Sequence, residues 1–248
     1  MPQPADALVD AVARRFARAG SLAKYYARGK LRHDPIYFAL LERALVPDAA
    51  RLLDLGCGQG ILLALLVEAR AAARAGHWPS AWPPPPAKLG LRGIERDRAE
   101  VRRARIAFES AGEPEAEVVL GDLRLAELPE SDVVVAIDVI HYLERVEQER
   151  LLARVARALA PGGVFLLRVC DAAAGWRALL TRLGDRLGTL SKLGRAGPLQ
   201  LRSAAEWRSL LEAHGLETEL VPMSAGTPFA NVLFTARRAA ESAPRGAA

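Results

Sequence analysis

The sequence predicts an α/β protein with an open, doubly wound sheet of seven strands, and three observations carry this prediction. Short apolar runs typical of strands alternate with segments of helical periodicity from residue 52 to residue 235. The first strand-like run is followed by closely spaced glycines and then by a helix start. The length of 248 residues suits one such domain with added segments and a substantial core.

The N-terminal region, residues 1–46, precedes the predicted sheet. Apolar residues recur at helical spacing over residues 6–20, and a second helix is expected over residues 36–45. Between them, residues 24–35 are polar and aromatic and do not look like core. Taken alone, this segment suits a surface linker.

The segment 51–60 predicts a strand, a tight glycine turn and the start of a helix. Gly56, Gly58 and Gly60 let the backbone turn sharply and lie close to a ligand, and the helix that follows offers free N–H groups. This combination predicts a cofactor loop. A dinucleotide fingerprint requires Gly-x-Gly-x-x-Gly, whereas this loop has Ile61 at the position of the third dinucleotide glycine. The spacing therefore weakens a nicotinamide dinucleotide interpretation.

An acidic residue two positions before the first glycine makes the motif more specific. Asp54-Leu55-Gly56-Cys57-Gly58-Gln59-Gly60 resembles the first motif of the class I S-adenosyl-L-methionine (SAM)-dependent methyltransferases, an acidic residue followed by Gly-x-Gly-x-Gly. The resemblance implies a Rossmann-like sheet, mostly parallel with its last strand antiparallel, and SAM as the cofactor. It places the cofactor on Asp54, Gly56, Cys57, Gly58 and Gly60. The alternative is an ordinary glycine turn in an unrelated α/β protein.

In the same family, N-terminal segments commonly fold over the cofactor and the substrate. The resemblance therefore makes residues 1–46 a helical cap, with Tyr25, Tyr26 and Arg28 as lid residues and His33 as a weaker candidate at the substrate. A plain surface linker remains the alternative for the segment that holds them.

Residues 77–87 form a proline- and tryptophan-rich insertion before the second strand. Its four consecutive prolines exclude a helix or a central strand and favour a stiff polyproline II rod. A rigid surface spacer and a docking motif are the two interpretations. His77 has no second ligand nearby in the sequence, and we predict no metal site.

The second strand, residues 89–94, ends at Glu95. In the methyltransferases that the chain resembles, an acidic residue here receives both ribose hydroxyls, which suits a carboxylate because it can accept two hydrogen bonds. Glu95 matches this position, Asp97 is the alternative, and Arg96 is placed with them at the cofactor. The separation from Asp54, 95 − 54 = 41 residues, exceeds the ~20 of a dinucleotide fold, and the proline insertion accounts for most of the excess.

The third strand, residues 118–120, leads to a second acidic position. Family members often place an acidic residue here beside the adenine amino group, with the next backbone N–H on a ring nitrogen. Asp122 and Leu123 match this arrangement. Capping of a helix or turn is the alternative role for Asp122.

The fourth strand, residues 132–137, is followed by Asp138-Val139-Ile140-His141-Tyr142-Leu143. Ligands of open parallel sheets bind at the carboxyl ends of strands, so this end should face the methionine part of the cofactor, with Asp138 there, and the acceptor. The segment lacks the Asn/Asp-Pro-Pro-Tyr motif of many methyltransferases that modify exocyclic base nitrogens or glutamine. It looks instead like small-molecule methyltransferases, and we expect no nucleic acid partner.

A neutral phenol or alcohol acceptor must lose a proton during methyl transfer. His141 lies just past the fourth strand, where the acceptor should sit, and an imidazole with its usual pKa near ~6.5 suits this task at neutral pH. His141 is therefore the candidate general base. The alternative is a histidine that only packs against, or hydrogen-bonds, the methionine end of the cofactor.

The remaining segments complete the expected methyltransferase domain, residues 47–238. They are a helix over 144–159, a turn over 160–163, a strand over 164–169, an amphipathic, partly helical insertion over 171–202, a helix over 204–214, and strands over 217–221 and 231–235. We expect the insertion to shape the acceptor pocket, with Phe229 also at the substrate and residues 239–248 as a disordered tail.

The formal net charge of +5 is equalled by one stretch of the chain. Residues 176–208 hold six arginines and one lysine against two acidic residues, an excess of 7 − 2 = +5. An acidic protein, an anionic membrane or a charged substrate could meet such a surface, and a solvated surface without a partner is the alternative. No apolar stretch reaches the ~18 residues of a membrane-spanning helix and no secretory signal starts the chain, so we expect a cytoplasmic protein.

Three motifs also look similar to methyltransferases associated with aryl-polyene and related pigment or lipid pathways. They are Tyr-Tyr-Ala-Arg-Gly-Lys-Leu-Arg, Asp-Leu-Gly-Cys-Gly-Gln-Gly and Gly-Thr-Pro-Phe-Ala-Asn-Val. The resemblance implies an aromatic, phenolic acceptor methylated on oxygen or ring carbon, and an acidic acyl carrier protein docked on residues 176–208 if the acceptor is carrier-bound. A SAM-binding scaffold without catalysis and, with less support, an NAD-dependent oxidoreductase are the alternatives, and the oligomeric state stays open.

Overall fold

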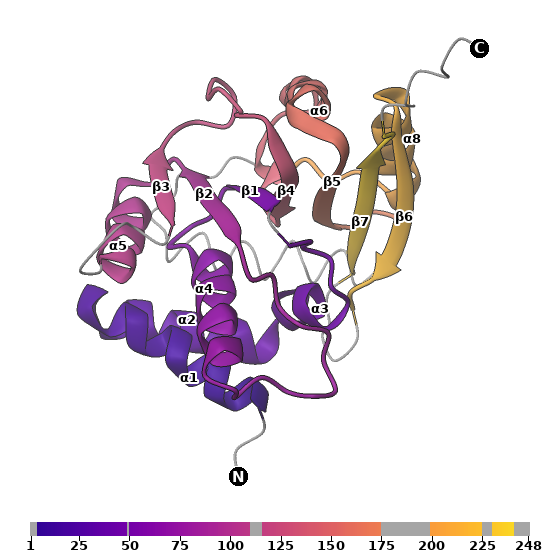
Figure 1. Cartoon of the computed structure of the whole chain (residues 1–248). Helices are drawn as coiled ribbons and strands as arrows, with labels where there is room; N and C mark the ends of the chain where they lie inside the picture. Colours follow the sequence, from indigo (N-terminus) through magenta and orange to yellow (C-terminus); the bar gives the residue numbers. More distant parts are fainter. Residues whose placement is uncertain (1–3, 49, 110–115, 175–198, 225–229, 241–248) are drawn as a thin grey trace. The chain divides into compact units, whose positions relative to one another are not determined.

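The computed structural model describes residues 4–48, 50–109, 116–174, 199–224 and 230–240 (Figure 1). They divide into two compact units, one that ends at residue 126 and one that begins at residue 127. The strands follow the order β3-β2-β1-β4-β5-β7-β6 in a mixed, mostly parallel sheet. This confirms the predicted α/β class with seven strands.

The first unit carries three parallel strands and the N-terminal helices. Its described elements are α1 (Pro4–Arg15), the 3-10 helix η1 (Phe16–Ala19), α2 (Ser21–His33), α3 (Ile36–Glu42), β1 (Ala50–Leu55), α4 (Ile61–Arg74), β2 (Leu89–Glu95), α5 (Arg98–Phe108) and β3 (Glu117–Leu120). Strand β2 pairs in parallel with both β1 and β3. Helix α1 packs against α2 and α4, and the three helices lie together in Figure 1.

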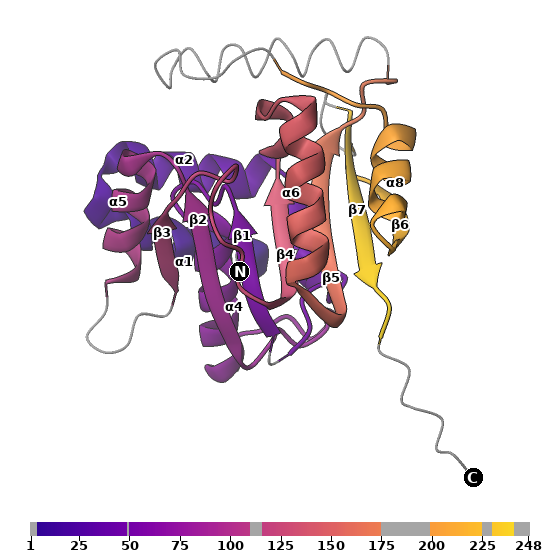
Figure 2. The same cartoon turned by 90° about the horizontal axis from the view of Figure 1, so that it is seen from above.

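The second unit carries the other four strands. Its described elements are β4 (Ser131–Ile137), the 3-10 helix η2 (Ile140–Tyr142), α6 (Arg145–Ala158), β5 (Leu159–Cys170), α8 (Ala204–Ala213), β6 (Leu216–Pro222) and β7 (Asn231–Arg238). Strands β4 and β5 are parallel, whereas β7 runs antiparallel to both β5 and β6, as expected for the last strand. Helix α6 packs against β5, and α8 packs against β6 and β7 (Figure 2).

Apolar side chains on both faces of the strands explain the layered packing. In β1, Leu52, Leu53 and Leu55 are all buried, and in β4 the run 133–136 is fully buried. A strand without polar alternation must be covered on both faces, which is typical of a parallel sheet between helices. Helix α4 is buried over most of its length for the same reason.

Helix α2 replaces the linker-like segment that the sequence suggested between the first two helices. Ala23, Ala27 and Leu31 recur every four residues and form its buried stripe. Its polar side carries salt bridges to α1, among them Arg28 to Asp10 at 3.2 Å. The tyrosines and charges in this segment masked the alanine stripe, which was the signal for a helix.

The expected turn at residues 160–163 lies within β5. Pairing with β4 shifts in register between Ser131 and Val133, and residues 160–163 fall at this irregularity. Gly162 there has a φ of 75°, and a Cβ on Gly163 would lie 2.8 Å from the carbonyl oxygen of Ala160. The Pro-Gly-Gly sequence therefore makes a bulge in a continuous strand.

The proline- and tryptophan-rich insertion is held on α3 by aromatic contacts. The rings of Trp78 and Trp82 lie 5.5 Å apart, and Trp82 lies 5.8 Å from the ring of Phe38. The indole N–H of Trp78 donates a 3.0 Å hydrogen bond to the carbonyl of Pro83. These contacts favour the rigid spacer over a docking motif, because the aromatic rings are already engaged.

Several predicted segments lie outside the described residues. They are residues 175–198 of the basic insertion, Phe229, and residues 241–248 of the tail. Among the residues that the structure does describe, no helix is both long and apolar enough to cross a lipid bilayer.

Candidate functional site

The glycine loop between β1 and α4 is pinned to the next strand. Gly56, Gly58 and Gly60 have φ values of 70°, 56° and 83°, a backbone region that other residues adopt only with strain. The N–H groups of Gly56 and Cys57 both donate to the carbonyl of Ile94, at 2.8 and 3.2 Å. The loop is therefore a fixed shape at the carboxyl end of β1.

The two sides of this loop differ in the space they leave. A Cβ on Gly60 would lie 2.9 Å from the ring of Phe108, so that side is closely packed. A Cβ on Gly58 would meet nothing within 4 Å, so that side is open. Cys57 fills space against Gly93, where a Cβ would lie 2.5 Å from the sulfur. Burial raises the pKa of the Cys57 thiol, which suits a packing role.

Glu95 holds the open side of the loop. One carboxylate oxygen accepts from the N–H of Gly58 at 3.0 Å, and the other accepts from the N–H of Asp97 at 2.8 Å. Each oxygen keeps a further lone pair for a ligand hydroxyl. The alternative residue, Asp97, instead caps α5, because its side chain accepts from the N–H groups of Ala99 and Glu100.

Asp54 is a buried carboxyl group without a protein donor. It is 4% exposed, and among the described residues no hydrogen bond reaches its side chain. Burial, assisted by the charge of Glu95, raises its pKa to about 7. A buried carboxylate of this kind favours a cationic ligand, since a nearby positive charge would restore the ionised form.

Asp122 and Leu123 follow β3, as predicted, but the carboxylate of Asp122 is already engaged. The Nε of Arg124 donates to both of its oxygens at 3.0 Å, and this guanidinium lowers the pKa of Asp122 to about 2. Leu123 is buried. Arg96 lies exposed after β2, and its charge also lowers the pKa of Asp122.

The predicted lid residues lie on α2, and they have different surroundings. Tyr25 and Tyr26 are 63% and 40% exposed. Arg28 is instead paired with Asp10 of α1, and His33 is exposed at the end of the helix. Of the predicted set, the two tyrosines and His33 are therefore exposed to solvent, whereas Arg28 is half-buried and paired.

In the second unit, the end of β4 is organised by an arginine. Arg168 of β5 is 1% exposed and forms a two-pronged salt bridge with Asp138, whose φ of 53° is unusual for a residue other than glycine. The carboxylate predicted to meet the cofactor is thus held by a buried guanidinium. Sequence reasoning missed Arg168, although a charge inside an apolar strand was visible.

His141 follows on η2 and is 2% exposed. Neither ring nitrogen has a hydrogen-bond partner within the described part of the chain. Burial lowers the pKa of the imidazole below its usual 6.5, and Asp138 opposes this shift. The ring is therefore neutral at neutral pH and has a free lone pair for a proton.

A polar network fixes the backbone of His141. Its carbonyl accepts from the N–H of Gln200 at 2.8 Å, and the carbonyl of Gln200 accepts from the buried amide of Gln148 at 2.8 Å. Arg202 donates to the same Gln148 side chain at 2.8 Å. Residues 200–202, which close the predicted insertion, are thus tied to the turn that carries His141.

A comparison with protein-family models decides the family. A model described as a methyltransferase domain matches residues 25–221, which is most of the chain. The chain belongs to this methyltransferase domain family. The match confirms the resemblance inferred from the glycine loop, at the level of the SAM-dependent methyltransferases.

A curated protein similar to this chain is also a methyltransferase. Trans-aconitate 2-methyltransferase of Azoarcus sp. (strain BH72) is 33% identical over 131 residues, which are 52% of this chain and 43% of that protein. The chain thus matches less than half the length of this curated relative.

Solved structures share the fold at low identity. An O-methyltransferase family protein from Burkholderia thailandensis has a TM-score of 0.61 at 16% identity, covering 92% of this chain and 63% of that one. Human N-acetylserotonin methyltransferase, solved with SAM, has a TM-score of 0.55 at 18% identity, covering 96% and 59%. Together the family and these structures support SAM as the cofactor.

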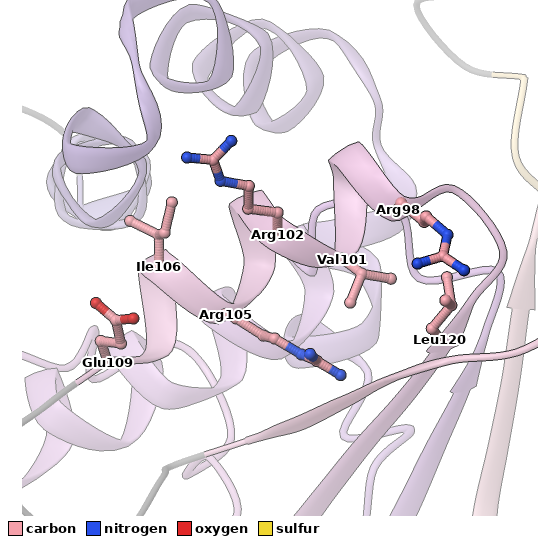
Figure 3. Close-up of a pocket in the computed structure, with 7 residues that line it drawn as sticks. All are labelled: Arg98, Val101, Arg102, Arg105, Ile106, Glu109 and Leu120. Carbon is pink, nitrogen blue, oxygen red and sulfur yellow. The ribbon is translucent and has the colours of Figure 1, made fainter.

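Helix α5 of the methyltransferase domain also borders a groove of about 480 Å³ (Figure 3). Its lining combines three arginines of α5 with apolar residues, and none of the predicted cofactor or substrate residues is part of it. The lining residues are Arg98, Val101, Arg102, Arg105, Ile106, Glu109 and Leu120.

Proposed function

We propose that this methyltransferase transfers a methyl group from SAM to a small aromatic, phenolic acceptor, on oxygen or on ring carbon. The observation that carries the proposal is the paired arrangement of Glu95 and Asp54 at an open glycine loop. Glu95 is held against the loop and keeps free lone pairs, and Asp54 is buried with no donor among the described residues. Together they fit a ligand with a diol and a positive charge.

Each residue of the first unit has a separate task in this proposal. Glu95 accepts the two ribose hydroxyls, and the left-handed glycines let the backbone approach the ligand at Gly58. Asp54 offsets the positive charge of the methionine part. Asp122 and Leu123 border the adenine, although the bond from Arg124 leaves Asp122 less able to accept another donor.

When bound, SAM supplies an electrophilic methyl group on its sulfonium. The chain must hold the acceptor in line with that group and exclude water. A neutral phenol also needs a base, and we assign this task to His141, whose buried imidazole is neutral and free to take the proton. Tyr25 and Tyr26 of α2 cover the aromatic acceptor.

Calorimetric titration with SAM, S-adenosylhomocysteine (SAH) and NADH tests the cofactor assignment. Wild-type protein should bind SAM and SAH but not NADH, and Glu95→Ala should lose both ligands. Methyl transfer from labelled SAM to a panel of phenols then tests the acceptor. Binding of NADH alone would turn the search to oxidoreductase chemistry, and the absence of SAM and SAH binding would end the proposal.

A SAM-binding scaffold without catalysis is the second candidate. The burial of His141, at 2% exposure, favours it, because a base must reach its substrate. Tight SAH binding with no methyl transfer to any phenol, amine or carboxylate in the panel would support this candidate.

We also propose that an acyl carrier protein presents the acceptor, since the sequence resembles methyltransferases associated with aryl-polyene and related pigment or lipid pathways. The basic stretch 176–208 would then bind the acidic carrier. Reversing the charge of Arg182, Arg186 and Arg195 should weaken turnover of a carrier-bound phenol and spare that of the free phenol. Equal turnover of the carrier-bound substrate would refute this docking site. Cytoplasmic location is part of the same proposal.

A further inference from the structure

Gln59 lies inside the glycine loop, yet its side chain points away from the open side. It is 2% exposed, and its amide nitrogen donates a 2.9 Å hydrogen bond to the carbonyl of Ala23, 36 residues earlier in α2. The left-handed glycines on either side of Gln59 turn the backbone so that neighbouring residues face different partners. The same loop thus faces the open side at Gly58 and contacts α2 through Gln59.

The contact on α2 falls in its first turn, which has no side-chain cap. No side chain caps its N-terminus, and the residue before it is Gly20 with a φ of 114°. An uncapped first turn frays readily because its N–H groups have no intrahelical partner. The bond from Gln59 reaches Ala23 in this first turn and is therefore well placed to order it.

The same turn presents an exposed apolar face. Leu22, Tyr25 and Tyr26 are 74%, 63% and 40% exposed, at the i, i+3 and i+4 spacing that gathers side chains on one side of a helix. The positions of these side chains depend on whether the first two turns of α2 are well ordered. The loop is therefore hydrogen-bonded to the helix turn from which this apolar surface begins.

We propose that Gln59 is a positioning residue that couples the cofactor loop to α2. Cofactor binding at the loop stabilises the Gln59 to Ala23 hydrogen bond and orders the helix turns that carry Leu22 and the two tyrosines. The proposal rests on the proposed function, since it takes SAM or SAH as the ligand. It adds a binding order to that function. The cofactor binds first, and the helix turns that meet the acceptor become ordered only afterwards.

Hydrogen exchange of wild-type protein, with and without SAH, tests this coupling. SAH should slow exchange of the amides over residues 24–28 by about 3- to 10-fold, the range expected for one neutral hydrogen bond. Gln59→Met keeps the length and apolar volume of the side chain but removes the donor, and it should abolish this slowing. Because coupling is reciprocal, its affinity for SAH should fall by the same factor and not by more.

Two further variants separate coupling from general loosening of the helix. Arg32→Ala removes a surface salt bridge from α2 to Asp6 and leaves Gln59 intact, so SAH should still slow exchange in that variant. Gln59→Leu, which also lacks a donor, should behave like Gln59→Met and serves if the methionine variant does not fold.

The outcomes distinguish this inference from the proposed function. SAH binding in calorimetry without slower exchange in α2, or slowing that persists in both Gln59 variants, would overturn the coupling and leave the cofactor assignment standing. Failure of SAH to bind wild-type protein would overturn the cofactor assignment and the coupling with it.

Discussion

Two carboxyl groups of the first unit, Asp54 and Asp122, have opposite electrostatic surroundings. Burial and the charge of Glu95 raise the pKa of Asp54 to about 7, whereas the guanidinium of Arg124 lowers that of Asp122 to about 2. At neutral pH the first is partly protonated and the second is ionised. A bound cation would therefore favour loss of the proton from Asp54, whereas Asp122 is already ionised.

Without ligand, Asp54 should make the protein less stable as the pH rises. The unfolded group ionises near 3.8 and the folded group near 7, so stability falls between these values, by up to about 4 kcal/mol in total. Asp54→Asn removes this titration. Its gain in unfolding free energy over wild type should grow from about pH 5 to about pH 8 in urea titrations.

Asp122→Asn is the control for this measurement. Its folded pKa of about 2 and unfolded pKa of 3.8 both lie below the tested range, so its effect should be constant across it. An Asp54→Asn effect that is equally constant would show that the buried carboxyl does not titrate in this range.

His141 gives a second prediction at this scale. If it is the general base, His141→Ala should reduce kcat for a phenolic acceptor by a factor on the order of 10² to 10⁴. Its pKa is lowered from 6.5 by burial, so the acid limb of wild-type activity should lie below that pH. His214→Ala, on the half-exposed histidine that ends α8, is the control. Full activity of His141→Ala would remove His141 from the chemistry.

At the scale of elements, the β1–α4 loop has a closely packed side and an open side. Gly60 is closed by the ring of Phe108 and Gly58 faces open space, although both have a left-handed backbone. Adding a side chain at each glycine should therefore affect different properties of the protein. The sequence motif alone does not distinguish the two positions.

Gly58→Ala and Gly60→Ala test this difference. The left-handed backbone should cost each variant about 1 to 2 kcal/mol of stability, and Gly60→Ala should lose more because its Cβ would lie 2.9 Å from Phe108. Gly58→Ala should instead bind SAH more weakly than Gly60→Ala does, since its added methyl group occupies the open side of the loop. Urea unfolding and calorimetry measure the two effects. Equal stability and equal affinity in both variants would contradict the assignment of sides.

At the scale of the whole molecule, the sequence predicted the sheet and the cofactor loop because both have local signals. Seven apolar runs and a glycine motif sit within short windows, so the strand number and the place of Glu95 followed from spacing. The capping bonds of Asp97 to α5 favour Glu95 over Asp97 as the residue that would meet the ligand. Such bonds depend on backbone geometry that spacing does not reveal.

The unpredicted features are long-range contacts. The bond from Gln59 to Ala23 joins residues 36 apart, and the salt bridge from Arg168 to Asp138 joins residues 30 apart. Each polar side chain was visible in an apolar or glycine context, but its partner was not. A polar residue at a buried position predicts that a partner exists, because burial without one is costly, and it does not predict which.

Ligand binding should stabilise the whole chain if the site is formed in the native state. SAH at about 100 times its Kd adds about 2.7 kcal/mol, which corresponds to a rise in Tm of roughly 5 to 11 °C for a domain of this size. The rise should grow with the logarithm of the SAH concentration, because only the native state binds. Glu95→Ala should show no rise at the same concentration, and NADH should produce none with wild type. An equal rise in Glu95→Ala would mean that SAH binds away from the β1–α4 loop, since Glu95 is bonded directly to Gly58 of that loop.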